Sequence, residues 1–262
     1  MGYYNDLKNL IEEMYYDNNN TPVSMIVVSY GGPVSLYFLT GGIVTQEWKD
    51  KFIGNYIPIG GAWSGGNFML QLLISGRLGL GENILPEFTP DYIKDILAEF
   101  LIPLFRSFQS SYYLLPRASL WEDTVLIETP NHKYTANDYE RLFEDIGFPV
   151  GYDMFRGIED IGEWPPSNPN VPTHCFYGID VDTPEIFKYS EDFPEITEPT
   201  TVEFGEDGDG QVSRAGSEMC LRWDGGDYPF YGHRYHGVHH VDLFQDDDVL
   251  REIGYIVHPN SN

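Results

Sequence analysis

The feature that most constrains the fold of this 262-residue chain is a short apolar run followed by a glycine-rich turn. Residues 24–28, SMIVV, are apolar and β-rich and fit a buried parallel strand. Residues 29–33, SYGGP, predict a tight turn, and residues 34–39, VSLYFL, predict a helix. Pro33 would lie in the first turn of this helix, where a missing N–H is harmless. The expected order is therefore strand, sharp turn, helix.

Other segments continue this alternation. Residues 4–16 carry apolar side chains at helical spacing. Further strands are expected at 56–59, 124–127, 174–177 and 200–204, and further helices at 48–52, at 136–146 and in a closing segment through Val257. Thr135 is expected to cap the helix at 136, Asp246 or Asp247 the closing helix, and Gly178 to begin a loop. Strands that alternate with helices predict a mostly parallel α/β sheet.

Residues 64–118 differ in character from the rest of the chain. They are rich in Leu, Ile and Phe, with scattered Gly and Pro and no strand alternation. We interpret this region as a helical cap inserted into a sheet domain formed by residues 1–63 and 119–262. One helical face within it combines Ile93, Ile96, Leu97, Phe100 and Leu101.

Composition restricts the classes of partner. Apolar residues make up 42% and aromatic residues 15%, which is typical of a globular chain. The net charge of −26 argues against nucleic acid, since phosphate binding needs Lys and Arg. No apolar run approaches the roughly 20 residues of a membrane span. The chain opens with a charged amphipathic segment, so we expect no signal peptide within it.

Ester chemistry needs a nucleophile, a base and a group that orients the base. Ser29 lies where a nucleophile elbow would place it, and the backbone N–H of Tyr30 could donate to a developing oxyanion. The usual elbow has Gly two residues before and two residues after the serine. Gly31 fits this pattern, whereas Val27 occupies a position where crowding should disfavour bulk. Taken alone, an ordinary turn that contains a serine explains the pattern better.

An acidic turn and a histidine cluster supply candidates for the other two roles. Residues 206–210, EDGDG, follow a predicted strand, and an Asp there can face a histidine. A solvated turn or a calcium loop is the alternative, although EF-hand spacing is absent. The histidines suit a catalytic base, a metal site with Asp242, or simple clustering in a surface loop. Their spacing does not match H-E-x-x-H, so we favour the base over the metal. The four histidines are His233, His236, His239 and His240.

Several separated blocks resemble the lecithin–cholesterol acyltransferase family, and especially its lysosomal phospholipase/acyltransferase branch. Around and after the turn these blocks are LIEEMYY, VSLYFL, EWKDKFI and IPIGGAWSGG. The middle of the chain contributes WEDTVLIETPNHKYTANDYERLFEDIGF. The last third contributes VPTHCFYGIDVDTP, EFGEDGDGQV and HGVHHVDL. The resemblance implies an α/β-hydrolase fold with an inserted helical cap.

The resemblance also implies roles for particular residues. It places the nucleophile on Ser29, the acid on Asp209 rather than Asp207, and the base on His240 rather than its three neighbours. It implies a disulfide between Cys175 and Cys220. Gly60, Gly61, Ala62 and Trp63, together with the cap, would line an acyl pocket.

The activity implied is acyl transfer from a glycerophospholipid or another lipid ester, through an acyl-serine, to water or a lipid alcohol. No metal or organic cofactor is required, a membrane or lipoprotein surface is an expected partner, and the location would be lysosomal or secreted. Two departures stand out. Val28 replaces the histidine that precedes the family's nucleophile, and the chain begins just before the nucleophile strand. The sheet is therefore expected to lack the family's first strands, and the alternative function is an inactive, truncated lipid-binding paralogue.

Overall fold

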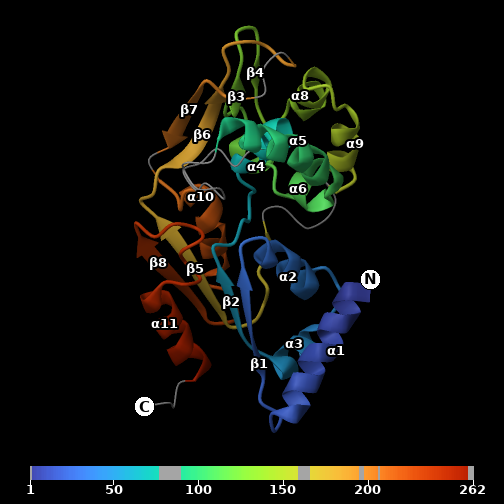
Figure 1. The fold of residues 1–262 in the computed structure, drawn as a ribbon. Helices are drawn as coiled ribbons and strands as arrows, with labels where there is room; N and C mark the ends of the chain where they lie inside the picture. Colours follow the sequence, from blue (N-terminus) through green and yellow to red (C-terminus); the bar gives the residue numbers. More distant parts are fainter. Residues whose placement is uncertain (1, 77–89, 159–165, 195–197, 206, 259–262) are drawn as a thin grey trace. The chain divides into compact units, whose positions relative to one another are not determined.

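The computed structural model describes residues 2–76, 90–158, 166–194, 198–205 and 207–258 (Figure 1). The chain divides into two compact units. The first comprises residues 1–63, 162–180 and 217–262, and the second comprises residues 64–161 and 181–216. The predicted cap, 64–118, falls within the second unit; the predicted domain boundaries remain a prediction.

A parallel sheet, sheet A, forms the centre of the first unit. Its strand order is β1-β2-β5-β8, and each neighbouring pair is parallel. The strands are β1 (Val23–Val28), β2 (Ile53–Ile59), β5 (Thr173–Ile179) and β8 (Phe230–His236). The prediction of a mostly parallel α/β sheet is confirmed.

The helices of the first unit cover sheet A on both faces. They are α1 (Gly2–Asp17), α2 (Gly31–Thr40), α3 (Gln46–Phe52), α11 (Asp247–Val257) and the 3₁₀ helix η1 (Glu218–Trp223). The buried Tyr56 points to α2, where its hydroxyl donates to the Gly32 carbonyl oxygen at 3.0 Å. Its neighbour Ile57 faces α11, because successive side chains of a strand point to opposite faces. The predicted helices at 4–16, 34–39 and 48–52 are confirmed.

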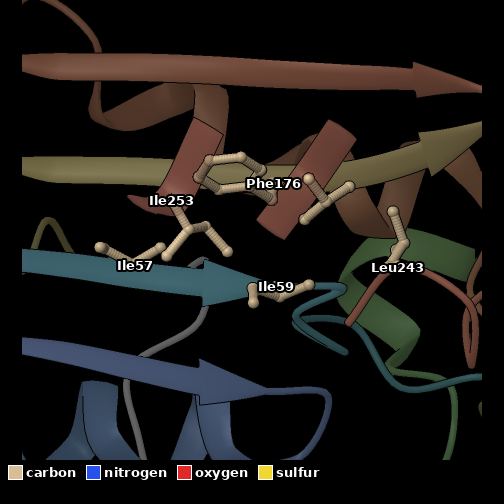
Figure 2. Packing of buried hydrophobic residues seen from close by; sticks show 6 residues of the cluster. Ile57, Ile59, Phe176, Leu243 and Ile253 are labelled. Atoms are coloured by element: carbon tan, nitrogen blue, oxygen red, sulfur yellow. The ribbon is translucent and has the colours of Figure 1, made fainter. Parts of the chain in front are cut away.

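The closing helix α11 begins where its cap predicts. The Asp246 carboxylate accepts from the N–H groups of Asp248 at 2.9 Å and Val249 at 3.1 Å, so Asp246 rather than Asp247 is the cap. Side chains of α11 and of the segment before it pack on sheet A (Figure 2). This buried cluster consists of Ile57, Ile59, Phe176, Leu243, Val249 and Ile253. The cluster fixes both α11 and residues 237–246, which connect β8 to α11.

Two expectations about sheet A were wrong, and one of its strands was not predicted. The strand β1 is not buried: among the described strands it pairs only with β2, so Ile26 is 49% exposed. Gly178 does not begin a loop, because β5 pairs with β8 through Ile179. The strand β8 was missed, since its sequence FYGHRYH is too polar to be recognised as a strand without its neighbour.

The second unit contains a mixed sheet, sheet B, that the sequence did not predict. Its strand order is β4-β3-β6-β7; β3 pairs with β6 in parallel, and the other two pairs are antiparallel. The strands are β3 (Ile127–Glu128), β4 (Lys133–Tyr134), β6 (Thr183–Lys188) and β7 (Thr201–Gly205). The strand expected at 124–127 overlaps β3 only at Ile127, where β3 begins. The strands β4 and β6 were not predicted. The strand expected at 200–204 is β7.

Helices form the rest of the second unit. They are α4 (Phe68–Ser75), α5 (Asp91–Ser107), α6 (Gln109–Tyr113), α7 (Ala118–Trp121), α8 (Tyr139–Asp145), α9 (Val150–Arg156) and α10 (Arg214–Ser217). The described part of 64–118 is therefore helical, as predicted, while residues 77–89 of the predicted cap lie outside the described residues. Ile93, Ile96 and Phe100 of the predicted apolar face are exposed. Across the described residues, no helix combines the length and the apolar character needed to cross a membrane.

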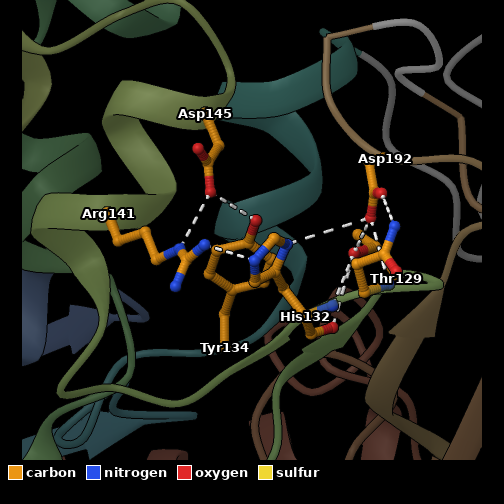
Figure 3. A network of polar contacts seen from close by, with 7 residues as sticks. Thr129, His132, Tyr134, Arg141, Asp145 and Asp192 are labelled. Atoms are coloured by element: carbon orange, nitrogen blue, oxygen red, sulfur yellow. Dashed lines mark hydrogen bonds and ion pairs between the residues drawn. The ribbon is translucent and has the colours of Figure 1, made fainter.

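The helix expected at 136–146 begins three residues late, for a local reason. The Asp138 carboxylate accepts from the Thr135 N–H at 2.8 Å and from its hydroxyl at 2.7 Å, which closes a turn before the helix. A polar network then ties β4 to α8 (Figure 3). The Tyr134 hydroxyl donates to Asp145 at 2.7 Å, and Arg141 pairs with the same carboxylate at 3.3 Å. Burial and the contact with Asp145 raise the pKa of Tyr134.

Candidate active site

A strained turn presents Ser29 at the end of β1. Ser29 has φ 51°, in the left-handed region that non-glycine residues rarely adopt. Its N–H donates to the Ile59 carbonyl oxygen on β2 at 2.9 Å, and its own carbonyl oxygen accepts from the Gly32 N–H at 2.9 Å. Strain of this kind persists only where the surroundings impose it, and it clusters at functional sites. The half-buried Ser29 is therefore held between two strand ends and the start of α2.

Of the two glycines in this turn, only Gly32 is needed for space. A Cβ at Gly31 would lie 3.5 Å from the Cβ of Val27, an ordinary contact, so the bulky residue at 27 does not crowd the turn. A Cβ at Gly32 would lie 3.0 Å from the ring of Trp63. Tyr30 directly follows the serine and occupies the N-cap position of α2.

The structure brings His240 to Ser29. His240 Nε2 lies 2.9 Å from Ser29 Oγ, although the two residues are 211 positions apart in sequence. His240 is only 6% exposed. Its segment is held by a hydrogen bond from the Leu243 N–H to the His239 carbonyl oxygen, at 3.1 Å, and by burial of Leu243 in the sheet A core. An imidazole at this distance can accept the hydroxyl proton, as a general base must.

Gly60, one of the predicted pocket residues, lies against the His240 ring, a contact that sequence reasoning did not predict. It has φ +57°, and a Cβ there would lie 3.1 Å from Cε1 and 3.2 Å from Nδ1 of His240. Its N–H donates to the Phe176 carbonyl oxygen at 2.8 Å, which fixes it at the end of β2. A glycine after a predicted strand signals a special backbone angle, but not that a histidine ring lies against it.

The other clustered histidines have different surroundings. His233 Nε2 lies 3.0 Å from His174 Nδ1, and His236 Nδ1 lies 2.5 Å from the Asp180 carboxylate. His239 is exposed. The cluster is therefore not confined to a surface loop, because His233 and His236 belong to β8. Within the described ranges, no three His, Cys, Asp or Glu side chains gather closely enough to hold a metal ion.

Asp209 belongs to the second unit, and its surroundings are described there. It is fully buried, and its Oδ1 accepts from the N–H groups of Gln211 at 3.1 Å and Val212 at 2.8 Å. It is thus not part of a solvated turn. Asp207 instead pairs with Arg214 at 2.7 Å. Residue 206 of the predicted acidic turn lies outside the described residues, and the role of Asp209 remains a prediction.

Trp63 and Gly61, two further predicted pocket residues, lie together in the first unit. Trp63 is 3% exposed, and its ring packs edge-to-face on Trp223 with centroids 5.1 Å apart. A Cβ at Gly61 would lie 2.4 Å from the Trp63 ring, so only glycine allows this packing. The indole also contacts the first turn of α2 at Gly32, which places it beside the turn that carries Ser29.

The disulfide implied by the resemblance is present. Cys175 of β5 is bonded to Cys220 of η1, with a sequence separation of 45. Reduction should lower the free energy of unfolding by about 2–4 kcal/mol, because the bond restricts the unfolded chain. Denaturant titrations with and without a reductant measure this difference. The double variant Cys175→Ala/Cys220→Ala should match the reduced protein and should itself no longer respond to reductant. Equal stability of the reduced and oxidised proteins would contradict the prediction.

Comparison with solved structures supports the fold class. The chain is similar to a chain in the crystal structure of the Tle4-Tli4 complex, with a TM-score of 0.61 at 12% identity. The match covers 97% of this chain and 65% of that one. At this identity the likeness concerns the fold alone. A parallel sheet with a serine at a strained strand-to-helix turn defines a fold of the α/β-hydrolase class.

Sequence comparison identifies the family. The model of the lecithin:cholesterol acyltransferase family matches residues 1–160 and 158–249. The chain belongs to this family.

Two curated relatives show how much of the family's length is represented. Phosphatidylcholine-sterol acyltransferase of Gallus gallus is 34% identical over 222 residues, which cover 84% of this chain and 49% of that protein. Lysosomal phospholipase A and acyltransferase of Canis lupus familiaris is 35% identical over 224 residues, which cover 85% of this chain and 50% of that protein. The chain therefore spans about half the length of these relatives.

Proposed function

We propose that the chain is the catalytic part of a lipid acyltransferase that also hydrolyses phospholipids in the manner of a phospholipase A. The observation that carries the proposal is the 2.9 Å contact between Ser29 Oγ and His240 Nε2 at a strained turn. The names of the relatives, a phosphatidylcholine-sterol acyltransferase and a lysosomal phospholipase A and acyltransferase, support a lipid ester as the substrate.

The chemistry proposed has two halves. His240 Nε2 accepts the proton of Ser29 as Oγ attacks the ester carbonyl carbon, and the backbone N–H of Tyr30 donates to the oxyanion. His240 then returns the proton to the leaving alcohol as the ester bond breaks, which leaves an acyl-serine. In the second half water or a lipid alcohol gives its proton to His240 and attacks the acyl carbon. The proton returns to Ser29 as the new acid or ester departs.

Other residues receive supporting roles in this proposal. Asp209 would orient His240 and stabilise its protonated form, and its burial and ordered carboxylate suit such a role. Gly61 and Trp63, together with the predicted cap, would line the acyl pocket. A membrane or lipoprotein surface would present the substrate, and the location would be lysosomal or extracellular.

Phosphatidylcholine vesicles that contain a lipid alcohol test the substrate class directly. We expect free fatty acid and the newly esterified alcohol to appear together, because both acceptors compete for one acyl-serine. Raising the share of lipid alcohol should shift product from acid to ester at a constant total rate of lysolipid release, if formation of the acyl-serine limits the rate. Ser29→Ala serves as the background. Absence of both products, or equal products from Ser29→Ala, would refute the proposal.

A further inference from the structure

A cluster of titratable side chains outside the catalytic pair joins β5, β8 and α11. His174 Nδ1 on β5 lies 3.0 Å from His233 Nε2 on β8. His233 Nδ1 lies 2.7 Å from Glu252 Oε1 on α11, and the Tyr235 hydroxyl donates to the other oxygen of the same carboxylate at 2.5 Å. Glu252 is therefore the polar attachment of α11 to the two strands.

Aromatic rings enclose both imidazoles. His233 stacks on Phe176 with centroids 4.2 Å apart, and His174 stacks on Tyr231 at 4.7 Å. The side chain of His233 is only 14% exposed. Burial, and then the neighbouring His233, lower the pKa of His174 to about 4. Because the two imidazoles are enclosed in this way, water has little access to replace the hydrogen bond between them.

The number of protons on the His174 and His233 rings decides whether this cluster can form. A hydrogen bond between two imidazoles needs one nitrogen without a proton. One added proton still leaves the pair one bare nitrogen that can accept the hydrogen bond, and the Glu252 carboxylate, 2.7 Å from His233 Nδ1, balances the added charge. A second proton sets N–H against N–H and places two cations side by side. The cluster therefore tolerates the first added proton but not the second.

The helix held by this cluster also holds the base. His240 lies in the segment 237–246 between β8 and α11, and Leu243 of that segment shares a core cluster with Val249 and Ile253 of α11. We propose that His174, His233 and Glu252 form an acid-sensitive latch that keeps α11 on sheet A. Double protonation of the imidazoles releases α11 and thereby displaces His240 from Ser29. The effect on catalysis rests on the proposed function, whereas the latch itself does not.

Charges on the surrounding elements do not oppose this effect. Burial, then the contact with Glu252, and then the charges of Asp246 and Asp248 raise the pKa of Tyr235, which therefore stays neutral as the pH falls. Tyr177 of β5 and Arg234 of β8 alternate with the latch residues along their strands and so point to the opposite face. There Arg234 lies 3.4 Å from Glu218 of η1 and 3.3 Å from the Tyr177 hydroxyl.

The sign of the pH dependence follows from His174. Its pKa is lower in the folded protein than the ordinary 6.5, so the released state takes up the proton first. The latch is therefore intact above pH 6.5 and weakens as the pH falls from 6.5 towards 4. With allowance for partial solvent screening, the opening equilibrium should rise about tenfold between pH 7 and pH 5.

Hydrogen exchange of the α11 amides, corrected for the intrinsic effect of pH, tests the latch. Wild type should show the tenfold rise. His174→Gln keeps a side chain that can hydrogen-bond but does not titrate, so its exchange should change by less than about twofold. Glu252→Gln removes the negative charge that balances the first added proton. The acid-induced rise in hydrogen exchange should therefore begin at a higher pH than in wild type. The matched control His236→Gln alters an exposed histidine outside the latch and should keep the wild-type response.

Two readouts separate the latch from the proposed function. A wild-type acid response in His174→Gln, or no acid response in wild type, overturns the latch whether or not the protein is active. Ester hydrolysis followed over the same pH range tests the connection to His240, because His174→Gln should retain more of its activity at pH 5 than wild type. An equal loss of hydrolytic activity at pH 5 in wild type and in His174→Gln would refute that connection. Absence of hydrolysis at any pH would refute the proposed function alone.

Discussion

Replacing Ser29 with alanine should lower kcat for a soluble short-chain ester by at least about a thousandfold. The reason is that the attacking oxygen is lost, while the fold has little cause to change. His240→Gln should cost a similar factor, since the glutamine can approach the Ser29 hydroxyl but cannot take its proton. Steady-state kinetics on purified variants measure both effects. Ser107→Ala, at an exposed position on α5, is the matched control and should retain wild-type kcat.

The double variant Ser29→Ala/His240→Gln sharpens this prediction. Nucleophile and base act as a unit, so the second substitution should add little to the first. If the two losses multiplied, the residues would act independently, and the 2.9 Å contact between them would not be the catalytic one. Full activity in either single variant would also contradict the assignment.

Gly60→Ala should lower kcat by about a hundredfold or more. The added methyl group would come within 3.1 Å of the His240 ring, which must move away from Ser29 to accommodate it. A displacement of this kind in a catalytic group is costly even when the chemistry of each group is intact. Alanine is also strained in the left-handed conformation of residue 60, which should lower the free energy of unfolding by about 1–2 kcal/mol.

Gly42→Ala separates these two effects. Gly42 has φ +76°, and a methyl group added there would meet nothing within 4 Å, so alanine introduces backbone strain without a collision. Its loss of stability should resemble that of Gly60→Ala, and its kcat should stay at the wild-type value. Equal kcat in the two variants, measured beside their denaturant unfolding curves, would show that Gly60 does not position the base.

Features that depend on neighbours in the sequence were predicted. Residues 24–39 predicted β1, the turn and α2, because strand, turn and helix signals follow one another there without a gap. The N-cap of α11 was also predicted, as Asp246 or Asp247, from side-chain chemistry alone. Both features depend on contacts between residues that are near in sequence.

Features that depend on distant partners were not predicted. The strand β8 takes its form from pairing with β5, and β4, which pairs with β3, is too short to show an alternating pattern. The contact of Gly60 with His240 and the pairing of His174 with His233 likewise arise only after the sheet has formed. The choice of His240 among four histidines came from family resemblance, because spacing alone left a base, a metal site and a surface cluster open.

The most direct test of the catalytic pair is covalent labelling with a fluorophosphonate, followed by peptide mass spectrometry. We expect rapid modification of wild type at Ser29 and at no other serine, because only this hydroxyl has a base at 2.9 Å within the described part of the chain that can activate it. Labelling should be slowed by at least about a hundredfold in His240→Gln. Unmodified Ser29 in folded wild-type protein, or equal labelling rates in wild type and His240→Gln, would contradict the assignment of Ser29 and His240 as nucleophile and base.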